Sequence, residues 1–135
     1  MDFSWTTISV NDMEKSLAFY QEIVLLPLQG RSNLEGGMEL AFLGAGETKV
    51  ELIWRKGEKP AHYGQDISMG FFVDDLDVMM KFVTDRGIPI LGGPFKPNEH
   101  VRFFYILDPN GLRIQFVQQT RKSWSTLIND SLPLV

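Results

Sequence analysis

The feature that most constrains the fold of this chain is an internal repeat with a spacing of 63 to 64 residues. Val10–Asp12 recurs as Val73–Asp75 at a spacing of 63, and Lys49–Leu52 aligns with Arg113–Phe116 at a spacing of 64. Because element order, helix start and final hairpin agree, duplication explains the likeness better than chance similarity of two amphipathic helices. The repeat predicts two modules, each with a strand, a helix and three further strands.

The first module opens with an alternating strand over Trp5–Val10, followed by Asn11 and Glu14 at the spacing of a capping box. Pro27 and Gly30 are expected to end the helix that follows. Its apolar stripe comprises Met13, Leu17, Tyr20 and Val24. The remaining strands are expected over Leu28–Arg31, Met38–Leu43 and Lys49–Trp54. Gly44–Gly46 is suited to the tight turn between the last two.

The second module repeats this pattern. A strand over Ser68–Val73 precedes a helix that opens at Asp74–Asp77 and is expected to end at Gly87. Its stripe comprises Leu76, Met79, Met80 and Val83. The remaining strands are expected over Ile88–Leu91, Val101–Leu107 and Leu112–Val117, with Asp108–Gly111 as the last turn. The two modules therefore predict an α+β fold.

Length and charge narrow the class of protein. A chain of 135 residues fits one domain, here expected over residues 1–120, with modules of about 1–60 and 65–120. Residues 121–135 form a tail expected to pack on the domain or on a partner. The net charge of −4 disfavours nucleic acid and membrane as partners, which leaves a small molecule. The start has no basic stretch before an apolar run, so the protein is expected to be cytoplasmic.

Several segments together resemble the vicinal oxygen chelate superfamily, which includes glyoxalase I, bleomycin-resistance and fosfomycin-resistance proteins, and extradiol dioxygenases. The segments are Ile8–Asp12, Ser16–Tyr20, Val50–Leu52, Phe72–Asp75, Gly92–Phe95 and Tyr105–Gly111. The resemblance implies two βαβββ modules whose curved mixed sheets line a shared cleft, commonly in a homodimer.

Strand alternation separates core residues from residues that face the ligand. Leu112, Ile114 and Phe116 form an apolar row, so Arg113, Gln115 and Val117 are expected in the cleft. By the same reasoning Val50 and Leu52 are core, whereas Lys49, Glu51 and Ile53 face the ligand. Matching Leu40 and Phe42 with Phe104 and Ile106 as core leaves Glu39, Ala41, Phe103 and Tyr105 in the cleft. The leading strands add Trp5, Thr7, Ser9, Ser68, Gly70 and Phe72.

The resemblance implies that metal-dependent members place one ligand on each leading and each final strand. Here these positions are Trp5, Ser68, Glu51 and Gln115, of which only Glu51 is an ordinary charged ligand. The sequence therefore predicts no metal cofactor and no classical glyoxalase I activity. The alternative is a Mg²⁺ or Mn²⁺ held by Glu39, Glu51, Gln115 and waters. His62 and His100 are expected to be solvated.

The leading hypothesis is a metal-free protein, similar to bleomycin-resistance proteins, that binds a flat organic molecule. The expected ligand-binding residues are Trp5, Thr7, Glu39, Glu51, Ser68, Phe72, Phe103, Tyr105, Arg113 and Gln115. Glu39 and Glu51 favour a cationic or amine-bearing ligand, unless Lys49 and Arg113 pair with them. The alternative for the aromatic residues is that they pack on one another.

Two other functions stay open. One is a lyase, isomerase or transferase with an altered or absent metal site, in which Glu51 and Tyr105 transfer a proton. The other is an interaction module without a small-molecule ligand, whose tail docks on a partner. That tail carries the apolar residues Trp124, Leu127, Ile128, Leu132 and Leu134.

Overall fold

The computed structural model describes residues 1–120, so the expected docking of the tail lies outside the described residues. The chain forms two compact units. The first comprises residues 1–63 together with Asp108–Gly111, and the second comprises residues 64–107 and the chain from Leu112 onward. Within residues 1–120, neither helix is long and apolar enough to cross a membrane.

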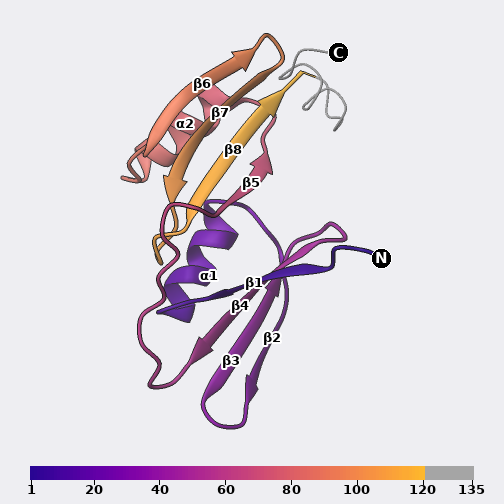
Figure 1. The fold of residues 1–135 in the computed structure, drawn as a ribbon, viewed down its shortest axis with the longest axis vertical. Coiled ribbons are helices and arrows are strands. Elements are labelled where there is room, and N and C mark those ends of the chain that lie inside the picture. The colour runs from indigo at the N-terminus through magenta and orange to yellow at the C-terminus, as the bar shows by residue number, and fades with distance from the viewer. Residues whose placement is uncertain (121–135) are drawn as a thin grey trace. The chain divides into compact units, whose positions relative to one another are not determined.

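The first unit is a four-stranded mixed sheet with one helix (Figure 1). Its elements are β1 (Trp5–Ser9), α1 (Met13–Glu22), β2 (Leu28–Leu34), β3 (Met38–Leu43) and β4 (Lys49–Arg55). The strand order is β1-β4-β3-β2, in which β1 and β4 are parallel and the other neighbours are antiparallel. The connection from β1 through α1 therefore returns the chain to the same sheet, as in the predicted module.

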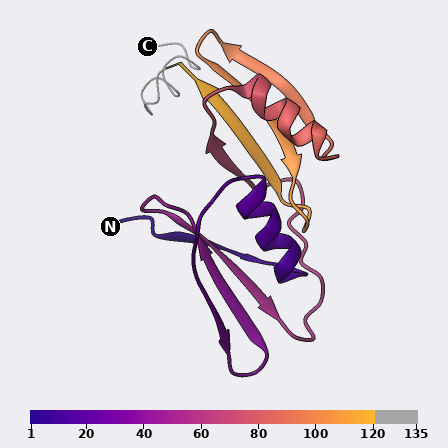
Figure 2. The ribbon, with the colours of Figure 1, turned by 180° about the vertical axis from the view of Figure 1, so that it is seen from behind.

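The second unit repeats this topology (Figure 2). Its elements are β5 (Ser68–Phe72), α2 (Leu76–Asp85), β6 (Gly92–Asn98), β7 (Val101–Leu107) and β8 (Arg113–Gln119). The order is β5-β8-β7-β6, with β5 and β8 parallel, and α2 covers one face of this sheet. The predicted α+β fold with two βαβββ modules is confirmed.

The spacing of the repeat changes by one residue between β7 and β8. Leu43 pairs with Val50 in the first sheet, and Ile106 pairs with Ile114 in the second. Leu43 and Ile106 are 63 residues apart, whereas Val50 and Ile114 are 64 apart. The turn at Asp108–Gly111 therefore contains one residue more than its counterpart in the first unit.

Each helix buries its apolar stripe against its own sheet. Tyr20 of α1 and Val83 of α2 are inaccessible to solvent, and the other predicted stripe residues inside the two helices are buried except Met80, which is half-buried. The strands contribute the alternate residues that the sequence predicts. These buried strand residues are Val50, Leu52, Phe104, Ile106, Ile114 and Phe116.

Three predicted boundaries are wrong. The N-cap of α1 is Asp12, whose carboxylate accepts a hydrogen bond from the Lys15 backbone, whereas Asn11 accepts one from the Ala61 backbone. The helix ends at Glu22, well before Pro27, and Leu25 then adopts a left-handed backbone with φ of 63°. The strand expected over Ile88–Leu91 begins at Gly92 instead.

A buried polar network joins α1 to the turn at Asp108–Gly111 within the first unit. The Tyr20 hydroxyl donates to Asp108 Oδ2 at 2.7 Å, and the Asn110 backbone donates to Asp108 Oδ1 at 2.8 Å. The Asn110 amide group contacts Ser16 Oγ and Asp108 Oδ2, each at 3.2 Å, while its Oδ1 accepts from the Asn11 backbone. Polar groups removed from water are thus satisfied by one another.

This environment shifts the titration of two tyrosines. Burial, then the charge of Asp108 and the hydrogen bond to it, raises the pKa of Tyr20 far above its ordinary value of 10.0. Burial and the charge of Asp108 also raise the pKa of Tyr63 to about 12, although its bond to the Ser9 carbonyl acts in the opposite direction.

We expect the free energy of unfolding to fall as the pH rises above about 10. From that pH upward the unfolded chain releases the Tyr20 proton while the folded chain retains it, so the folded state binds more protons. Tyr20 alone contributes a slope of up to about 1.4 kcal/mol per pH unit. Urea unfolding at a series of alkaline pH values measures this slope. Tyr20→Phe should flatten it, and an unchanged slope would contradict the assignment.

Candidate functional site

The open face of the first sheet, opposite the face that packs on α1, gathers residues from β1, β3 and β4. Thr7 pairs with Glu51 between β1 and β4, and Phe42 pairs with Glu51 between β3 and β4. Paired residues project from the same face of a sheet. The face therefore presents Trp5, Thr7, Ser9, Leu40, Phe42, Lys49, Glu51 and Ile53.

Glu51 is the central polar residue of this face. Its side chain lies in a residue that is only 9% exposed, and its Oε1 accepts a hydrogen bond of 2.5 Å from the Thr7 hydroxyl. Among residues 1–120 no lysine, arginine or histidine forms an ion pair with it. The Lys49 ammonium bonds to the Gly46 carbonyl instead. The expectation that Lys49 pairs with Glu51 is therefore wrong.

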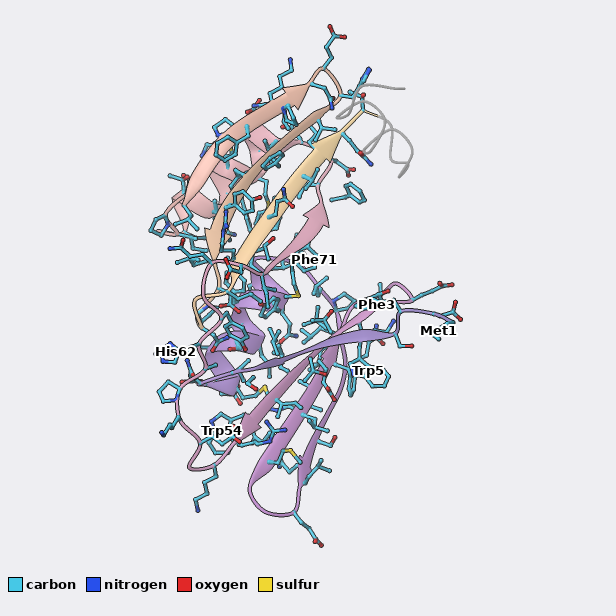
Figure 3. The ribbon with its side chains drawn as sticks, in the orientation of Figure 1. Met1, Phe3, Trp5, Trp54, His62 and Phe71 are labelled. Atoms are coloured by element: carbon cyan, nitrogen blue, oxygen red, sulfur yellow. The ribbon has the colours of Figure 1, made fainter. Side chains whose placement is uncertain are left out.

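Trp5 and Phe42 provide aromatic surface beside this carboxylate. Their rings meet edge to face with centroids 6.0 Å apart, and Trp5 remains 53% exposed. Figure 3 shows Trp5 and Trp54 on opposite sides of the first sheet. The Trp5 ring thus contacts another aromatic residue and still leaves accessible surface for a ligand.

Glu39 and Ala41 lie on the other face of the sheet, contrary to the sequence prediction. Ala41 pairs with Leu52 and is fully buried, and Glu39 pairs with Trp54. The Glu39 carboxylate lies 3.6 Å from the Arg31 guanidinium, which also contacts Glu14 at 2.5 Å. Glu39 therefore does not share a face with Glu51 and cannot act together with it there.

The reason is the longer turn of the second unit. Aligning β3 with β7 at the spacing of 64 that fits β4 and β8 shifts the register by one residue, which exchanges the two faces of a strand. With the observed spacing of 63, Phe42 corresponds to Tyr105 and Leu40 to Phe103. The sequence signal was present, because the helix starts already align at 63.

The open face of the second sheet carries the residues that the sequence placed there. Gln115 pairs with Tyr105 and with Gly70, and Arg113 pairs with Ser68 and with Leu107. Val117 pairs with Phe103 and Phe72, and Phe72 is 45% exposed. A Cβ atom added at Gly70 would lie 3.3 Å from Gln115 Oε1, so the Gln115 side chain lies close over the Gly70 backbone.

Three rings pack on one another on this face, and one of them was missed by the sequence prediction. Phe95 lies 5.4 Å from Phe103 and 6.4 Å from Tyr105, and Phe103 lies 5.7 Å from Tyr105, measured between centroids. Phe95 is 47% exposed, while Phe103 and Tyr105 are half-buried. Mutual packing, the alternative considered above, thus coexists with an accessible aromatic surface.

The donor set does not fit the metal site that the fold family implies. The four positions hold an indole, a hydroxyl, a neutral amide and a single carboxylate, in Trp5, Ser68, Gln115 and Glu51. Within the described residues, no group of three or more His, Asp or Glu residues comes together. The His100 ring contacts the Thr120 hydroxyl at 2.9 Å.

Comparison with known proteins establishes the family. The sequence model of the Glyoxalase/Bleomycin resistance protein/Dioxygenase superfamily matches residues 2–116. The chain belongs to this superfamily. A lactoylglutathione lyase from Neisseria meningitidis serogroup A is 31% identical over 122 residues, which cover 84% of this chain and 88% of that protein.

Solved structures agree with the superfamily fold. Glyoxalase I of Leishmania major, described as trypanothione-dependent, superposes with a TM-score of 0.77 at 21% identity and covers 87% of this chain and 86% of its own. TnmS3, an antibiotic binding protein from Streptomyces sp. CB03234, has a TM-score of 0.72 at 22% identity and covers 89% and 97%. Within the superfamily, the same βαβββ repeat thus occurs in an enzyme and in a binding protein.

Proposed function

We propose that this protein binds a small organic molecule that carries an aromatic ring and an amine, without a divalent metal. The observation that carries the proposal is the buried carboxylate of Glu51. Its printed partner is the Thr7 hydroxyl, and it lies on the same open face as the Trp5 and Phe42 rings.

A carboxylate in such a position favours a cationic partner. Removing a charged group from water is costly unless another charge or several hydrogen bonds compensate for it, and Thr7 supplies one hydrogen bond. An ammonium group would supply the opposite charge, and the adjacent ring faces attract cations as well as aromatic ligands. An aromatic amine satisfies both requirements.

The absence of a metal from the proposal rests on the side chains at the four family positions. A neutral amide and a hydroxyl are weak ligands for transition metals, and tryptophan has no lone pair to donate. The similarity in fold to an antibiotic binding protein supports a function in binding. The lactoylglutathione lyase relative suggests the enzymatic alternative, which the experiment below also tests.

We expect Glu51→Gln to weaken the binding of naphthylmethylamine by about tenfold or more, because it removes one charge-assisted contact and preserves side-chain shape. Isothermal titration calorimetry of the full chain measures this change. Naphthalenemethanol, which has the same ring without the charge, should bind both proteins equally.

Glu39→Gln is the matched control, because it removes the same charge from the opposite face of the same sheet. Equal losses in the two variants would attribute the effect to overall charge and contradict the assignment to Glu51. Undetectable binding of the amine to the wild-type protein would reject the proposed ligand class.

Thermal unfolding with Ni²⁺, Zn²⁺, Mn²⁺ and Mg²⁺ forms the second part of this experiment. An ion at one hundred times its Kd would add about 2.7 kcal/mol, and we expect no such gain. Stabilisation by an ion that Glu51→Ala abolishes, together with turnover of lactoylglutathione, would establish the enzyme instead. We also propose that the protein is a homodimer, which light scattering tests.

A further inference from the structure

The open face of the second sheet holds a cation in a fixed position. The Arg113 guanidinium carbon lies 4.3 Å from the centroid of the Tyr105 ring, and its Nη1 donates to the Gln65 carbonyl at 3.2 Å. Stacking and hydrogen bonding both restrict the long side chain. Arg113 therefore loses less conformational freedom when it binds a ligand than a free surface arginine would.

This cation has no acidic partner within residues 1–120. Arg31 pairs with Glu14 and Glu39, Arg55 pairs with Glu58, and Arg102 pairs with Asp77, but no ion pair includes Arg113. In a chain with 17 acidic and 13 basic residues, such a partner would be easy to supply. The Nε atom of Arg113 is buried without a hydrogen bond, so the guanidinium is incompletely satisfied by the protein itself.

The surroundings of Arg113 suit an anion attached to a ring. The residues that share its face through strand pairing are Ser68, Gly70, Phe72, Phe95, Phe103, Tyr105, Leu107, Gln115 and Val117, and none of them is acidic. Ser68 and Gln115 can donate hydrogen bonds to a carboxylate. Phe95, Phe103 and Tyr105 form an aromatic cluster next to this set of donors.

We propose that this face, centred on Arg113, is a binding site for the carboxylate group of an aromatic acid. The guanidinium and the Gln115 amide bind the carboxylate, and the ring of the acid packs on the aromatic cluster of Phe95, Phe103 and Tyr105. The site shares with the proposed function the premise that an open sheet face binds small molecules. It does not require the amine site at Glu51.

The test is titration of the full chain with naphthoate and with naphthalenemethanol. We expect naphthoate to bind at least about tenfold more tightly, because only the acid forms a charge-assisted contact with Arg113. Its affinity should fall as salt is added, since salt screens a partly exposed charge pair. Equal affinity of the two probes, or affinity independent of salt, would overturn the proposal.

Arg113→Gln should remove the preference for naphthoate over naphthalenemethanol. Lys49→Gln is the matched control, because Lys49 occupies the corresponding position of the first sheet and its loss removes the same charge. A loss of affinity in Lys49→Gln as large as that in Arg113→Gln would overturn the proposal. Should Arg113→Gln fail to fold by circular dichroism, the wild-type comparison of probes and salt still decides the outcome.

Glu51→Gln separates this proposal from the amine site. It should leave naphthoate binding within about twofold while it weakens naphthylmethylamine binding. Naphthoate binding that depends on Arg113 would stand even where the amine shows no binding. Naphthoate binding that Glu51→Gln abolishes would overturn the assignment to the second sheet.

Discussion

Replacing Asp108 by alanine is expected to lower the free energy of unfolding by about 3–4 kcal/mol, a large effect for one side chain. The carboxylate is 5% exposed and accepts hydrogen bonds from the Tyr20 hydroxyl, the Asn110 backbone and the Asn110 amide. Alanine would leave these donors buried without an acceptor. Urea unfolding followed by circular dichroism at neutral pH measures the loss.

Asp77→Ala is the control for this prediction. Asp77 forms an ion pair of 3.0 Å with Arg102, but its side chain is 73% exposed, so its removal should have an effect of less than about 1 kcal/mol. A double-mutant cycle of Asp108→Ala with Tyr20→Phe should show strong coupling, because both substitutions remove the same hydrogen bond. Similar losses for Asp108→Ala and Asp77→Ala, or additive effects in the cycle, would contradict the buried network.

Gly93→Ala is expected to lower the free energy of unfolding by about 2–4 kcal/mol. The backbone of Gly93 has φ of 102°, which residues with a side chain rarely adopt. An added Cβ would also lie 2.9 Å from the Phe103 carbonyl oxygen and 3.1 Å from Phe104 Cα. These neighbours are backbone atoms of β7, so β6 would have to move away from β7.

That movement should also affect ligand binding. Phe95 follows two residues after Gly93 and forms part of the aromatic cluster, so Gly93→Ala should weaken naphthoate binding as well as stability. Gly30→Ala in β2, the corresponding edge strand, is the control, because an added Cβ there has no neighbour within 4 Å. Wild-type stability of Gly93→Ala in urea unfolding would show that the edge strand adapts without cost.

The sequence was sufficient to predict the two modules, because apolar periodicity and turn residues recur in both copies. It also assigned the faces of β4, β7 and β8 correctly, since the alternation in these strands is unambiguous. The prediction failed at β3, where Met38–Leu43 is apolar at five of six positions and offers little alternation. The face of such a strand depends on its register, which the length of a distant turn determines.

Contacts between residues far apart in sequence were also beyond the prediction. Asp108 and Asn110 read as turn residues, and nothing local to them indicates that they bind Tyr20 and Ser16 of α1. The same holds for Phe95, whose place beside Phe103 depends on an irregular pairing of β6 with β7. Sequence patterns determine which face a residue occupies more readily than which partner it meets.

The location of the Asp108–Gly111 turn in the first compact unit also bears on how the duplication arose. A primitive protein with only one βαβββ half could satisfy the α1 tyrosine and serine only by accepting such a turn from a second molecule. The equivalent turn of the first half, Gly44–Thr48, has no Asp-Pro-Asn-Gly sequence, so the exchange is no longer reciprocal. Fusion of the halves thus converted a contact between molecules into one within a chain, and a present-day half expressed alone would lack part of its own interior.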